Sequence, residues 1–280
     1  MKNVAIKSFT VGEGEPLCLF LGPCALESKE LAFEVAHFIK EITQNRNCNI
    51  VFKSSFDKAN RSSFSSKRGL GMAAGLQVLA DIKDIFGFPI VTDIHLPEQA
   101  KPVAEVCDVL QIPAFLCRQT DLITAAANTG RVIKVKKGQF VAPWDMAQAV
   151  SKVRMCGNDQ IILTERGTMF GYNNLVSDMR SIPIMQSLGV PVCFDASHSV
   201  QLPGAKGTES GGERIYIKSL AKAAIAIGAN SLFVECHPCP DQAISDKASQ
   251  LPLEELPAFL DEVLALYTLT QSFSNLGVQE

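Results

Sequence analysis

The sequence of 280 residues has no apolar run that approaches the roughly 18 residues required to cross a membrane. Its N-terminal segment, MKNVAIKSFTVGEG, has no apolar core of the kind found in secretion signals. The net charge is only −3, so there is no overall basic excess that would indicate a nucleic-acid partner. We therefore expect a cytoplasmic protein that associates with neither membranes nor nucleic acid.

The 9 cysteines are odd in number and lack the spacing of a disulfide scaffold. Cys18, Cys107 and Cys193 lie in strand-like runs, where a small reduced core residue is the default interpretation. Cys236 and Cys239 form a C-x-x-C pair, but a second pair for a zinc ribbon and a thioredoxin-like setting are both missing. The sequence therefore favours neither a redox nor a metal role for that pair.

Short apolar runs alternate with longer helical patterns along the chain. The predicted strands are Leu17–Gly22, Asn49–Lys53, Pro89–Asp93, Val109–Pro113, Arg131–Lys136, Gln160–Thr164, Pro191–Asp195 and Ser231–Glu235. The predicted helices are Lys29–Thr43, Met72–Phe86, Pro97–Val106, Asp121–Thr129, Asp145–Met155, a helix ending over Ile182–Leu188, Arg214–Ile227 and Leu253–Thr270. The first of them is amphipathic and has Leu31, Val35, Phe38 and Ile42 on its apolar face.

Eight β–α units in a chain with no linker or repeat favour an α/β fold, a single (β/α)8 TIM barrel domain over residues 1–280. We expect the residues before Leu17 to form a short N-terminal cap on the bottom of the barrel. A doubly wound sheet is the alternative. The glycines between Gly69 and Gly75 do not support it, because their spacing is G-x-G-x-x-x-G and they follow a long loop instead of a tight turn.

Polar or titratable side chains follow nearly every predicted strand, where the chemistry of such barrels is located. They are Cys24, Lys53, Asp93, His95, Gln111, Lys136, Glu165, Arg166, Asp195, His198, Glu235 and His237. Core packing would not place them all at one end of the barrel, so this pattern predicts an enzyme. A non-catalytic barrel that serves as a binding module is the alternative.

The segment Val51–Gly71 is the most basic of these strand ends and is also rich in serine. Such a segment is either a solvated loop or a phosphate-binding one, since charge-assisted hydrogen bonds suit phosphate oxygens. Cations from other strand ends join it to form the set Lys53, Lys58, Arg61, Lys136, Arg166 and Arg118. Six cations in one barrel mouth would repel one another, which predicts an anionic occupant, and two phosphorylated or carboxylated molecules suit them better than one.

A second subset consists of Cys24, His198, Glu235 and Asp246, any of which could bind a metal. One thiolate, one imidazole and two carboxylates suit zinc, iron or manganese better than calcium or magnesium. Each of the four, taken alone, is more often structural. Ser197 and His198 beside Asp195 have the composition of a catalytic triad, but no G-x-S-x-G elbow accompanies them.

With these residues in view, the chain closely resembles the 3-deoxy-D-manno-octulosonate 8-phosphate synthases from about residue 17 to residue 255. The matching segments are GPC at 22–24, FKSSFDKANRSS at 52–63, IPAFLCRQTD at 112–121, VKKGQF at 135–140, TERG at 164–167, FGYNNL at 170–175, DASHSVQLPG at 195–204, and ECHP at 235–238 with SD at 245–246. KANRS at 58–62 is the most specific segment, because the related synthase of the aromatic pathway has a Lys-Pro-Arg-Thr type of sequence there.

The resemblance implies a transferase that condenses phosphoenolpyruvate with D-arabinose 5-phosphate and water for lipopolysaccharide biosynthesis. Its products are 3-deoxy-D-manno-octulosonate 8-phosphate and phosphate. The aromatic-pathway synthase, which uses erythrose 4-phosphate, and a metal-dependent aldolase are the alternatives. Asn60 and Ser62 disfavour the first of these, and the doubled set of cations disfavours the second.

The resemblance also implies roles for individual residues. Lys53, Lys136 and Arg166, with Gln111 nearby, would hold phosphoenolpyruvate, while Lys58, Asn60, Arg61 and Ser62 would hold arabinose 5-phosphate. Arg118 would reach the sugar phosphate from a neighbouring subunit of a homotetramer. The residues expected to be catalytic are Lys58, Lys136, Asn60, His198 and Asp246. Lys67 and Arg68 receive no role.

The family contains metal-dependent members with cysteine at the position of Cys24 and metal-independent members with asparagine there. The cysteine of this chain implies one divalent ion per subunit, held by Cys24, His198, Glu235 and Asp246. Zinc, iron and manganese remain open as its identity. Aldehyde orientation and water activation remain open as its role.

Overall fold

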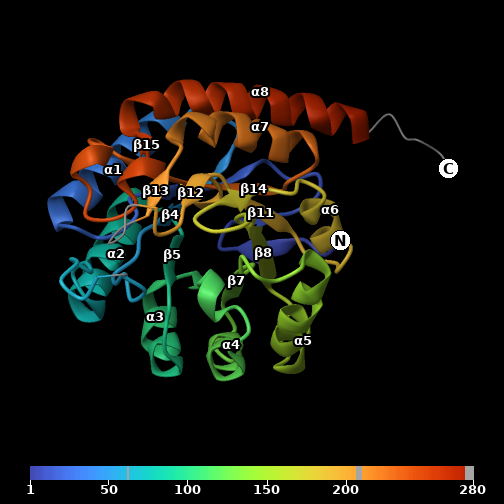
Figure 1. The fold of residues 1–280 in the computed structure, drawn as a ribbon, viewed down its shortest axis with the longest axis horizontal. Coiled ribbons are helices and arrows are strands. Elements are labelled where there is room, and N and C mark those ends of the chain that lie inside the picture. Colours follow the sequence, from blue (N-terminus) through green and yellow to red (C-terminus); the bar gives the residue numbers. More distant parts are fainter. Residues whose placement is uncertain (62, 206–209, 275–280) are drawn as a thin grey trace.

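The computed structural model describes residues 1–61, 63–205 and 210–274. Within them, parallel strands close into a barrel in the order β3, β4, β5, β6, β7, β8, β11 and β14, and β14 pairs back with β3 (Figure 1). These strands are β3 (Cys18–Gly22), β4 (Asn49–Lys53), β5 (Ile90–Asp93), β6 (Val109–Ile112), β7 (Val132–Lys136), β8 (Ile161–Glu165), β11 (Val192–Asp195) and β14 (Ser231–His237). The predicted (β/α)8 barrel is confirmed. Its strands are rich in valine, isoleucine and leucine because both faces of a parallel sheet are buried.

Helices cover the outside of the barrel (Figure 1). They are α1 (Lys29–Thr43), α2 (Met72–Phe86), α3 (Ala100–Val106), α4 (Thr120–Ala127), α5 (Ala147–Met155), α6 (Ser181–Gln186), α7 (Ile217–Ala226) and α8 (Leu256–Ser274). None of the helices in the described residues is both long and apolar enough to cross a membrane.

Helix α1 has the predicted bounds but presents a different face to the barrel. Ser28 caps it by accepting a hydrogen bond from the backbone of Leu31 at 3.1 Å. The fully buried stripe contains Ala32, Val35, Ala36 and Ile39, whereas the larger residues expected on that face, such as Phe38, are only partly buried. Small alanines allow the helix to approach the sheet closely, so side-chain size misled the prediction.

Helix α6 is shorter than the sequence predicted. It begins at Ser181 and ends at Gln186, because the preceding residues form a small antiparallel pair, β9 (Thr168–Met169) and β10 (Leu175–Val176). The chain between β8 and α6 therefore passes through this hairpin instead of turning directly into a helix.

The N-terminal residues form the predicted cap. Strands β1 (Val4–Ile6) and β2 (Phe9–Val11) pair as an antiparallel hairpin. Its side chains Val4, Ile6 and Val11 are buried in one cluster with barrel residues such as Phe20 and Val51, which lie at the bottom interior. The hairpin closes the bottom, which leaves the opposite end as the open mouth of the barrel.

Candidate active site

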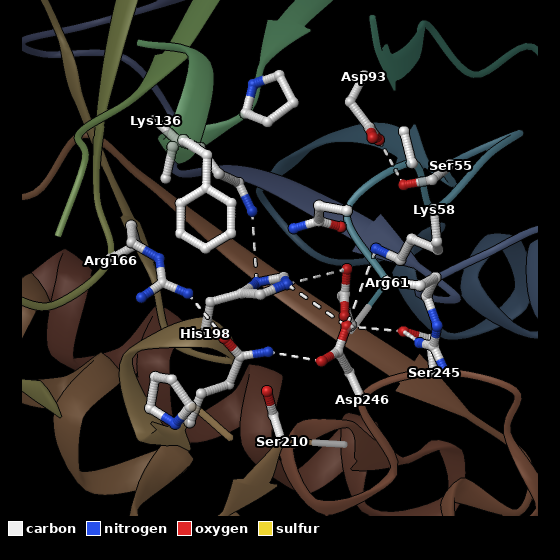
Figure 2. A pocket seen from close by; sticks show the side chains of 18 of the residues that line it. Ser55, Lys58, Arg61, Asp93, Lys136, Arg166, His198, Ser210, Ser245 and Asp246 are labelled. Atoms are coloured by element: carbon white, nitrogen blue, oxygen red, sulfur yellow. Dashed lines mark hydrogen bonds and ion pairs between the residues drawn. The ribbon is translucent and has the colours of Figure 1, made fainter. Parts of the chain in front are cut away.

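A cavity of about 510 Å³ lies at the carboxyl ends of the barrel strands. Polar side chains from strand ends on several sides of the barrel converge on it, among them Asp93, Lys136, Arg166 and His198 (Figure 2). This convergence agrees with the strand-end pattern seen in the sequence. A cavity of this size and polarity accommodates small phosphorylated molecules.

Most of the residues predicted to bind substrates line this cavity. They are Lys53, Lys58, Asn60, Arg61, Gln111, Lys136 and Arg166. Ser62 lies outside the described residues. Arg118 is exposed and does not line the cavity of its own chain, so five of the six predicted cations meet there.

Two of the cations are already neutralised by buried acids. The ammonium of Lys53 lies 2.5 Å from Glu235 Oε1, and the ammonium of Lys136 lies 2.6 Å from Asp195 Oδ2. Burial alone would raise the pKa of Asp195, but His198 and Lys136 hold it well below its ordinary value. The protein therefore supplies part of the countercharge itself, and a bound anion is not the only group that makes these cations tolerable.

Arg166 retains unused hydrogen-bonding capacity. Its side chain is buried, and its Nη1 has no hydrogen-bond partner among the described residues. The carboxylate of Glu165 fixes the backbone here by accepting hydrogen bonds from the amides of Arg166 at 3.1 Å and Gly167 at 2.7 Å. A buried guanidinium with a free donor facing a cavity is suited to an anionic ligand.

The basic loop after β4 contributes Lys58, Asn60 and Arg61 to the cavity wall. Arg61 donates from Nη1 to Ser245 Oγ at 2.7 Å, and Lys58 Nζ lies 3.9 Å from Asp246 Oδ2. Burial would lower the pKa of Lys58, but Cys24, Glu235 and Asp246 raise it well above its ordinary value. Lys58 is therefore protonated at neutral pH.

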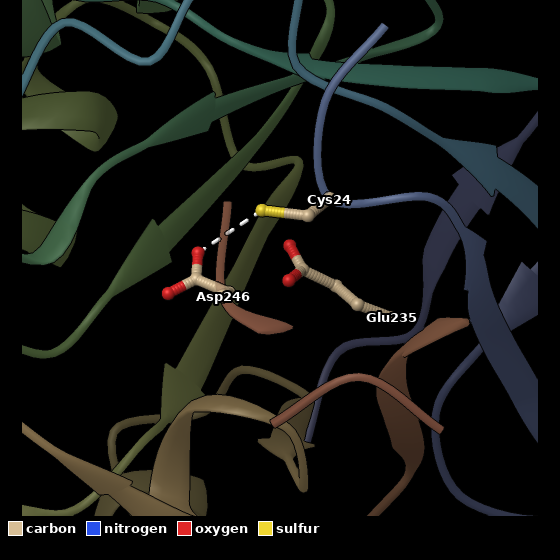
Figure 3. A group of neighbouring side chains, drawn as sticks. All are labelled: Cys24, Glu235 and Asp246. Atoms are coloured by element: carbon tan, nitrogen blue, oxygen red, sulfur yellow. Dashed lines mark hydrogen bonds between the residues drawn. The ribbon is translucent and has the colours of Figure 1, made fainter. Parts of the chain in front are cut away.

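The four predicted metal ligands come together on one side of the cavity. Ligand atoms of Cys24, Glu235 and Asp246 all lie within 4.8 Å of one another (Figure 3). His198 Nε2 lies 3.7 Å from Glu235 Oε1 and 3.9 Å from Asp246 Oδ2. Glu235 Oε2 is buried and has no hydrogen-bond partner among the described residues. The donor set and this unsatisfied oxygen fit a divalent ion of the zinc, iron or manganese type.

The acids of this cluster are ionised and its thiol is protonated. Burial and the neighbouring Asp246 and Glu235 raise the pKa of Cys24 well above its ordinary value. The thiol donates a hydrogen bond to Asp246 Oδ2 at 3.0 Å. Burial opposes ionisation of Glu235 and Asp246 as well. Lys53, His198 and Lys58 nevertheless lower the pKa of Glu235, and Lys58 and His198 lower the pKa of Asp246.

The orientation of His198 suits a metal ligand. Its Nδ1 lies 2.8 Å from Asp195 Oδ2 and its backbone amide donates to Asp195 Oδ1 at 2.8 Å. The carboxylate favours the tautomer with hydrogen on Nδ1, which leaves a lone pair on Nε2 facing Glu235 and Asp246. Ser197 Oγ instead accepts a hydrogen bond from the Glu235 amide at 2.8 Å, so the triad-like composition of this segment has no catalytic geometry.

Close backbone packing brings the first and second strand ends together. A Cβ atom added to Gly22 would lie 2.0 Å from the carbonyl oxygen of Lys53. Because glycine stands there, Lys53 Nζ can donate to the carbonyl of Cys24 at 2.8 Å. Gln250 then links Cys24 to the Asp246 segment, since it accepts from the Cys24 amide at 3.1 Å and donates to the Ser245 carbonyl at 2.9 Å.

Some strand-end residues lie away from the cavity. His237 contacts Glu27 instead, with Nε2 3.4 Å from its Oε1. Arg68, which had no predicted role, forms an exposed ion pair with Asp57. Cys236 is buried and Cys239 exposed, and both thiols are free.

Gln201 is the main site residue that the prediction missed. It lines the cavity and contacts both Arg166 and Asp246. It lies within the matching segment at 195–204, but it is neutral and is not at a strand end. Neither the charge pattern nor the strand-end rule could therefore single it out.

The comparisons with known proteins agree with this site. A family model described as the DAHP synthetase I family matches residues 2–272. A protein from Nitratidesulfovibrio vulgaris strain DP4 is 60% identical over 251 residues, which cover 90% of this chain and 92% of the relative. A protein from Protochlamydia amoebophila is 52% identical over 97% of this chain and 98% of its own length. A protein from Brucella anthropi is 53% identical over 94% of this chain and 95% of its own length. All three are named 2-dehydro-3-deoxyphosphooctonate aldolase.

Proposed function

The chain belongs to the DAHP synthetase I family, and we propose that it condenses phosphoenolpyruvate with D-arabinose 5-phosphate and water. The product is 2-dehydro-3-deoxyphosphooctonate, the compound after which its relatives are named, and inorganic phosphate is released. The observation that carries the proposal is one cavity with cations on two sides. Lys136 and Arg166 lie on one side, and Lys58 and Arg61 lie on the other.

The first group would hold phosphoenolpyruvate. Lys53 ends β4, Lys136 ends β7, and Arg166 follows β8 with a donor that has no partner among the described residues. Gln111 also lines the cavity, and its Oε1 accepts a hydrogen bond from Lys134 at 3.2 Å. Because that oxygen is occupied, the amide nitrogen of Gln111 is left for an anionic ligand.

The second group would hold the sugar phosphate. Lys58, Asn60 and Arg61 lie on the loop after β4, and Ser62 follows them in the chain. Arg118 would complete the phosphate site from a neighbouring subunit of a homotetramer. Its exposure and its place outside the cavity of its own chain support this arrangement.

A divalent ion held by Cys24, His198, Glu235 and Asp246 would complete the site. When bound, such an ion supplies a Lewis acid that orients the sugar aldehyde or activates water. We propose that the enzyme depends on this ion, because the buried, unpartnered carboxylate oxygen of Glu235 is otherwise costly here.

In the reaction, C3 of phosphoenolpyruvate forms a bond to the aldehyde carbon of the sugar, and water adds at C2. The bond between C2 and the oxygen that carries the phosphoryl group then breaks, and inorganic phosphate leaves. Protonated Lys58 and Asn60 are placed to stabilise the aldehyde oxygen as it gains charge. Lys136, held by Asp195, would stabilise the anionic end of phosphoenolpyruvate.

The aromatic-pathway alternative is not favoured, since relatives at 52–60% identity carry the octonate name. We propose that the protein acts in the cytoplasm, in the synthesis of the sugar acid of lipopolysaccharide. Its 9 cysteines are all free, which agrees with a reducing compartment.

The test follows phosphoenolpyruvate loss and phosphate release with either arabinose 5-phosphate or erythrose 4-phosphate, before and after chelation and with metals restored. We expect consumption with arabinose 5-phosphate only, loss of activity on chelation, and recovery with a divalent ion. No consumption with arabinose 5-phosphate under any metal condition would exclude the main proposal. Consumption of pyruvate in place of phosphoenolpyruvate would favour the aldolase alternative. Full activity after rigorous chelation would exclude only the metal dependence.

A further inference from the structure

Gln201 hydrogen-bonds both Arg166, proposed to bind phosphoenolpyruvate, and Asp246, proposed to bind the metal. Arg166 Nη2 donates to its Oε1 at 2.7 Å, and its Nε2 donates to Asp246 Oδ1 at 2.6 Å. Figure 2 shows Arg166 and Asp246 on this side of the cavity, with dashed bonds converging between them. The side chain is only 9% exposed, so little water competes for these bonds.

The chemistry of both partners determines the orientation of this amide. A guanidinium can only donate hydrogen bonds and an ionised carboxylate can only accept them. A glutamine between them satisfies each with the appropriate atom and adds no charge. Without an intervening group, a guanidinium and a carboxylate form a direct, often bidentate pair.

Such a direct pair would impair both binding sites. It would occupy the donors of Arg166 that face an anionic ligand and the oxygens of Asp246 that face a metal. The rest of Asp246 is already committed to the cluster, since its Oδ2 accepts from Cys24 at 3.0 Å and from Ser245 at 3.1 Å. A spacer therefore has a clear physical purpose at this position.

We propose that Gln201 is a positioning residue that keeps Arg166 and Asp246 apart, so that phosphoenolpyruvate and the metal ion bind without first breaking an ion pair. The inference rests on the proposed function, and it adds a residue to which no role has been assigned.

Truncation of the spacer has a specific thermodynamic consequence. In Gln201→Ala, Arg166 and Asp246 can close on each other, and whichever ligand binds first must separate them. The second ligand then binds without that cost, so the two ligands become more cooperative than in the wild-type protein. Coupling between sites is reciprocal, so the effect must have the same size in either order of binding.

The experiment measures phosphoenolpyruvate affinity by calorimetry with metal-free and metal-loaded protein. The affinity for cobalt(II) is then measured with and without phosphoenolpyruvate, which completes the thermodynamic cycle. The charge-transfer absorbance that the Cys24 thiolate would give reports cobalt binding. For Gln201→Ala we expect each ligand alone to bind about tenfold more weakly. The ratio of the phosphoenolpyruvate dissociation constant of the metal-free protein to that of the metal-loaded protein should be at least about fivefold larger than in wild type.

Gln201→Met separates spacing from hydrogen bonding, because methionine fills the same volume without polar atoms. It should weaken both ligands but leave the coupling ratio near the wild-type value. The matched control is Gln186→Ala, which removes a glutamine that also makes two hydrogen bonds, to Gly228 and Asn230, outside the cavity. It should change neither affinity nor coupling, and thermal unfolding checks that every variant is folded.

Equal coupling ratios in wild type and Gln201→Ala would overturn the proposed spacer role of Gln201, even if the affinity for each single ligand changes. An increased ratio in Gln201→Met would also overturn it, since that variant cannot collapse. Failure of the wild-type protein to bind phosphoenolpyruvate in either state would overturn the proposed function itself, and the inference with it.

Discussion

The thiol of Cys24 is protonated in the metal-free protein because it is buried beside the carboxylates of Asp246 and Glu235. A metal ion binds the thiolate, so binding must displace that proton. The neighbouring carboxylates are already ionised at neutral pH and release none. Metal binding at this site should therefore be coupled to one proton.

We predict that metal affinity increases about tenfold for each pH unit between about pH 6 and pH 8. The sign follows from the raised thiol pKa, because a higher pH reduces the cost of removing the proton. Calorimetry in buffers of different ionisation enthalpy should record release of about one proton per ion. In Cys24→Asn the proton release should disappear, and any activity that remains should be insensitive to chelation. Unchanged proton release in Cys24→Asn would show that another group loses the proton.

Lys134 is a second buried residue whose ionisation matters, and the proposed reaction does not use it. It lies inside the barrel on β7, over the rings of Phe20 and Phe233, and burial lowers its pKa to about 8. Its ordinary pKa is about 10.4 in an unfolded chain. The unfolded state therefore binds the proton more tightly, and protonated Lys134 reduces stability below about pH 8.

Lys134→Met should accordingly raise the free energy of unfolding at pH 7 by about 1–3 kcal/mol. This range allows for the loss of the hydrogen bond that Lys134 donates to Gln111. The difference in the free energy of unfolding between the variant and wild type should decrease as the pH rises from about 8 towards about 10.4. Near the upper value Lys134 loses its proton in the unfolded as well as in the folded protein. Urea unfolding at several pH values measures it. The exposed Lys101→Met is the control and should stay within about 0.5 kcal/mol of wild type. If the difference in the free energy of unfolding does not decrease with rising pH, the protonation of buried Lys134 is not its cause.

At the scale of elements, helix α2 and the basic loop before it are packed too closely for any side chain at Gly75. A Cβ atom there would lie 2.5 Å from Phe56 Cβ and 3.3 Å from Leu26 Cδ1. Phe56 is buried and belongs to the loop that carries Lys58 and Arg61 into the cavity. The helix therefore acts as the support that sets the position of the loop.

Gly75→Ala should lower the free energy of unfolding by about 1–3 kcal/mol through overpacking, even though alanine is the better helix former. The displaced loop should also raise the KM for arabinose 5-phosphate more than the KM for phosphoenolpyruvate. Asp84→Ala, at an exposed position of the same helix, is the control and should change neither quantity appreciably. A stabilised Gly75→Ala protein would show that the loop moves aside without cost.

At the scale of the whole molecule, one chain holds nearly all of the proposed site but not Arg118. Its guanidinium is exposed outside the cavity, and its carbonyl accepts a hydrogen bond from Lys152 at 2.8 Å. If the proposed homotetramer completes the sugar-phosphate site, Arg118 acts in the active site of a different chain.

Complementation between two defective variants tests this. Arg118→Ala should raise the KM for arabinose 5-phosphate at least about tenfold, and Lys136→Ala should be nearly inactive. When the two are mixed in equal amounts and reassembled, about a quarter of the sites should regain both wild-type residues. Activity should then rise above the average of the two variants. No gain after verified subunit exchange would show that Arg118 does not act between chains.

Much of the fold could be predicted because its signals are local. Apolar runs and helical periodicity depend on residues close in sequence, and they identified the strands from β3 to β14 and bounds such as those of α1 and α2. The choice of ligand types was also local, since Cys24 and His198 closely follow predicted strands, Glu235 ends one, and Asp246 lies in the segment after it. The buried face of α1 was mispredicted because packing against the barrel decides it, and α6 is shorter than predicted because the β9–β10 pair occupies the chain before it.

The sequence by itself determined the alternation of strands and helices, the polar residues at their ends and, by resemblance, the family. Only the tertiary structure decided which of those residues meet. Pairing of β14 with β3 brings Cys24 to Glu235 and Asp246, and neutral Gln201 and Gln250 then link segments far apart in the chain. The same closure leaves His237 beside Glu27 and Arg118 outside the cavity. The physical reason is that backbone preferences act over a few residues, whereas contacts across a barrel depend on its closure and on the cost of leaving buried polar atoms unpaired.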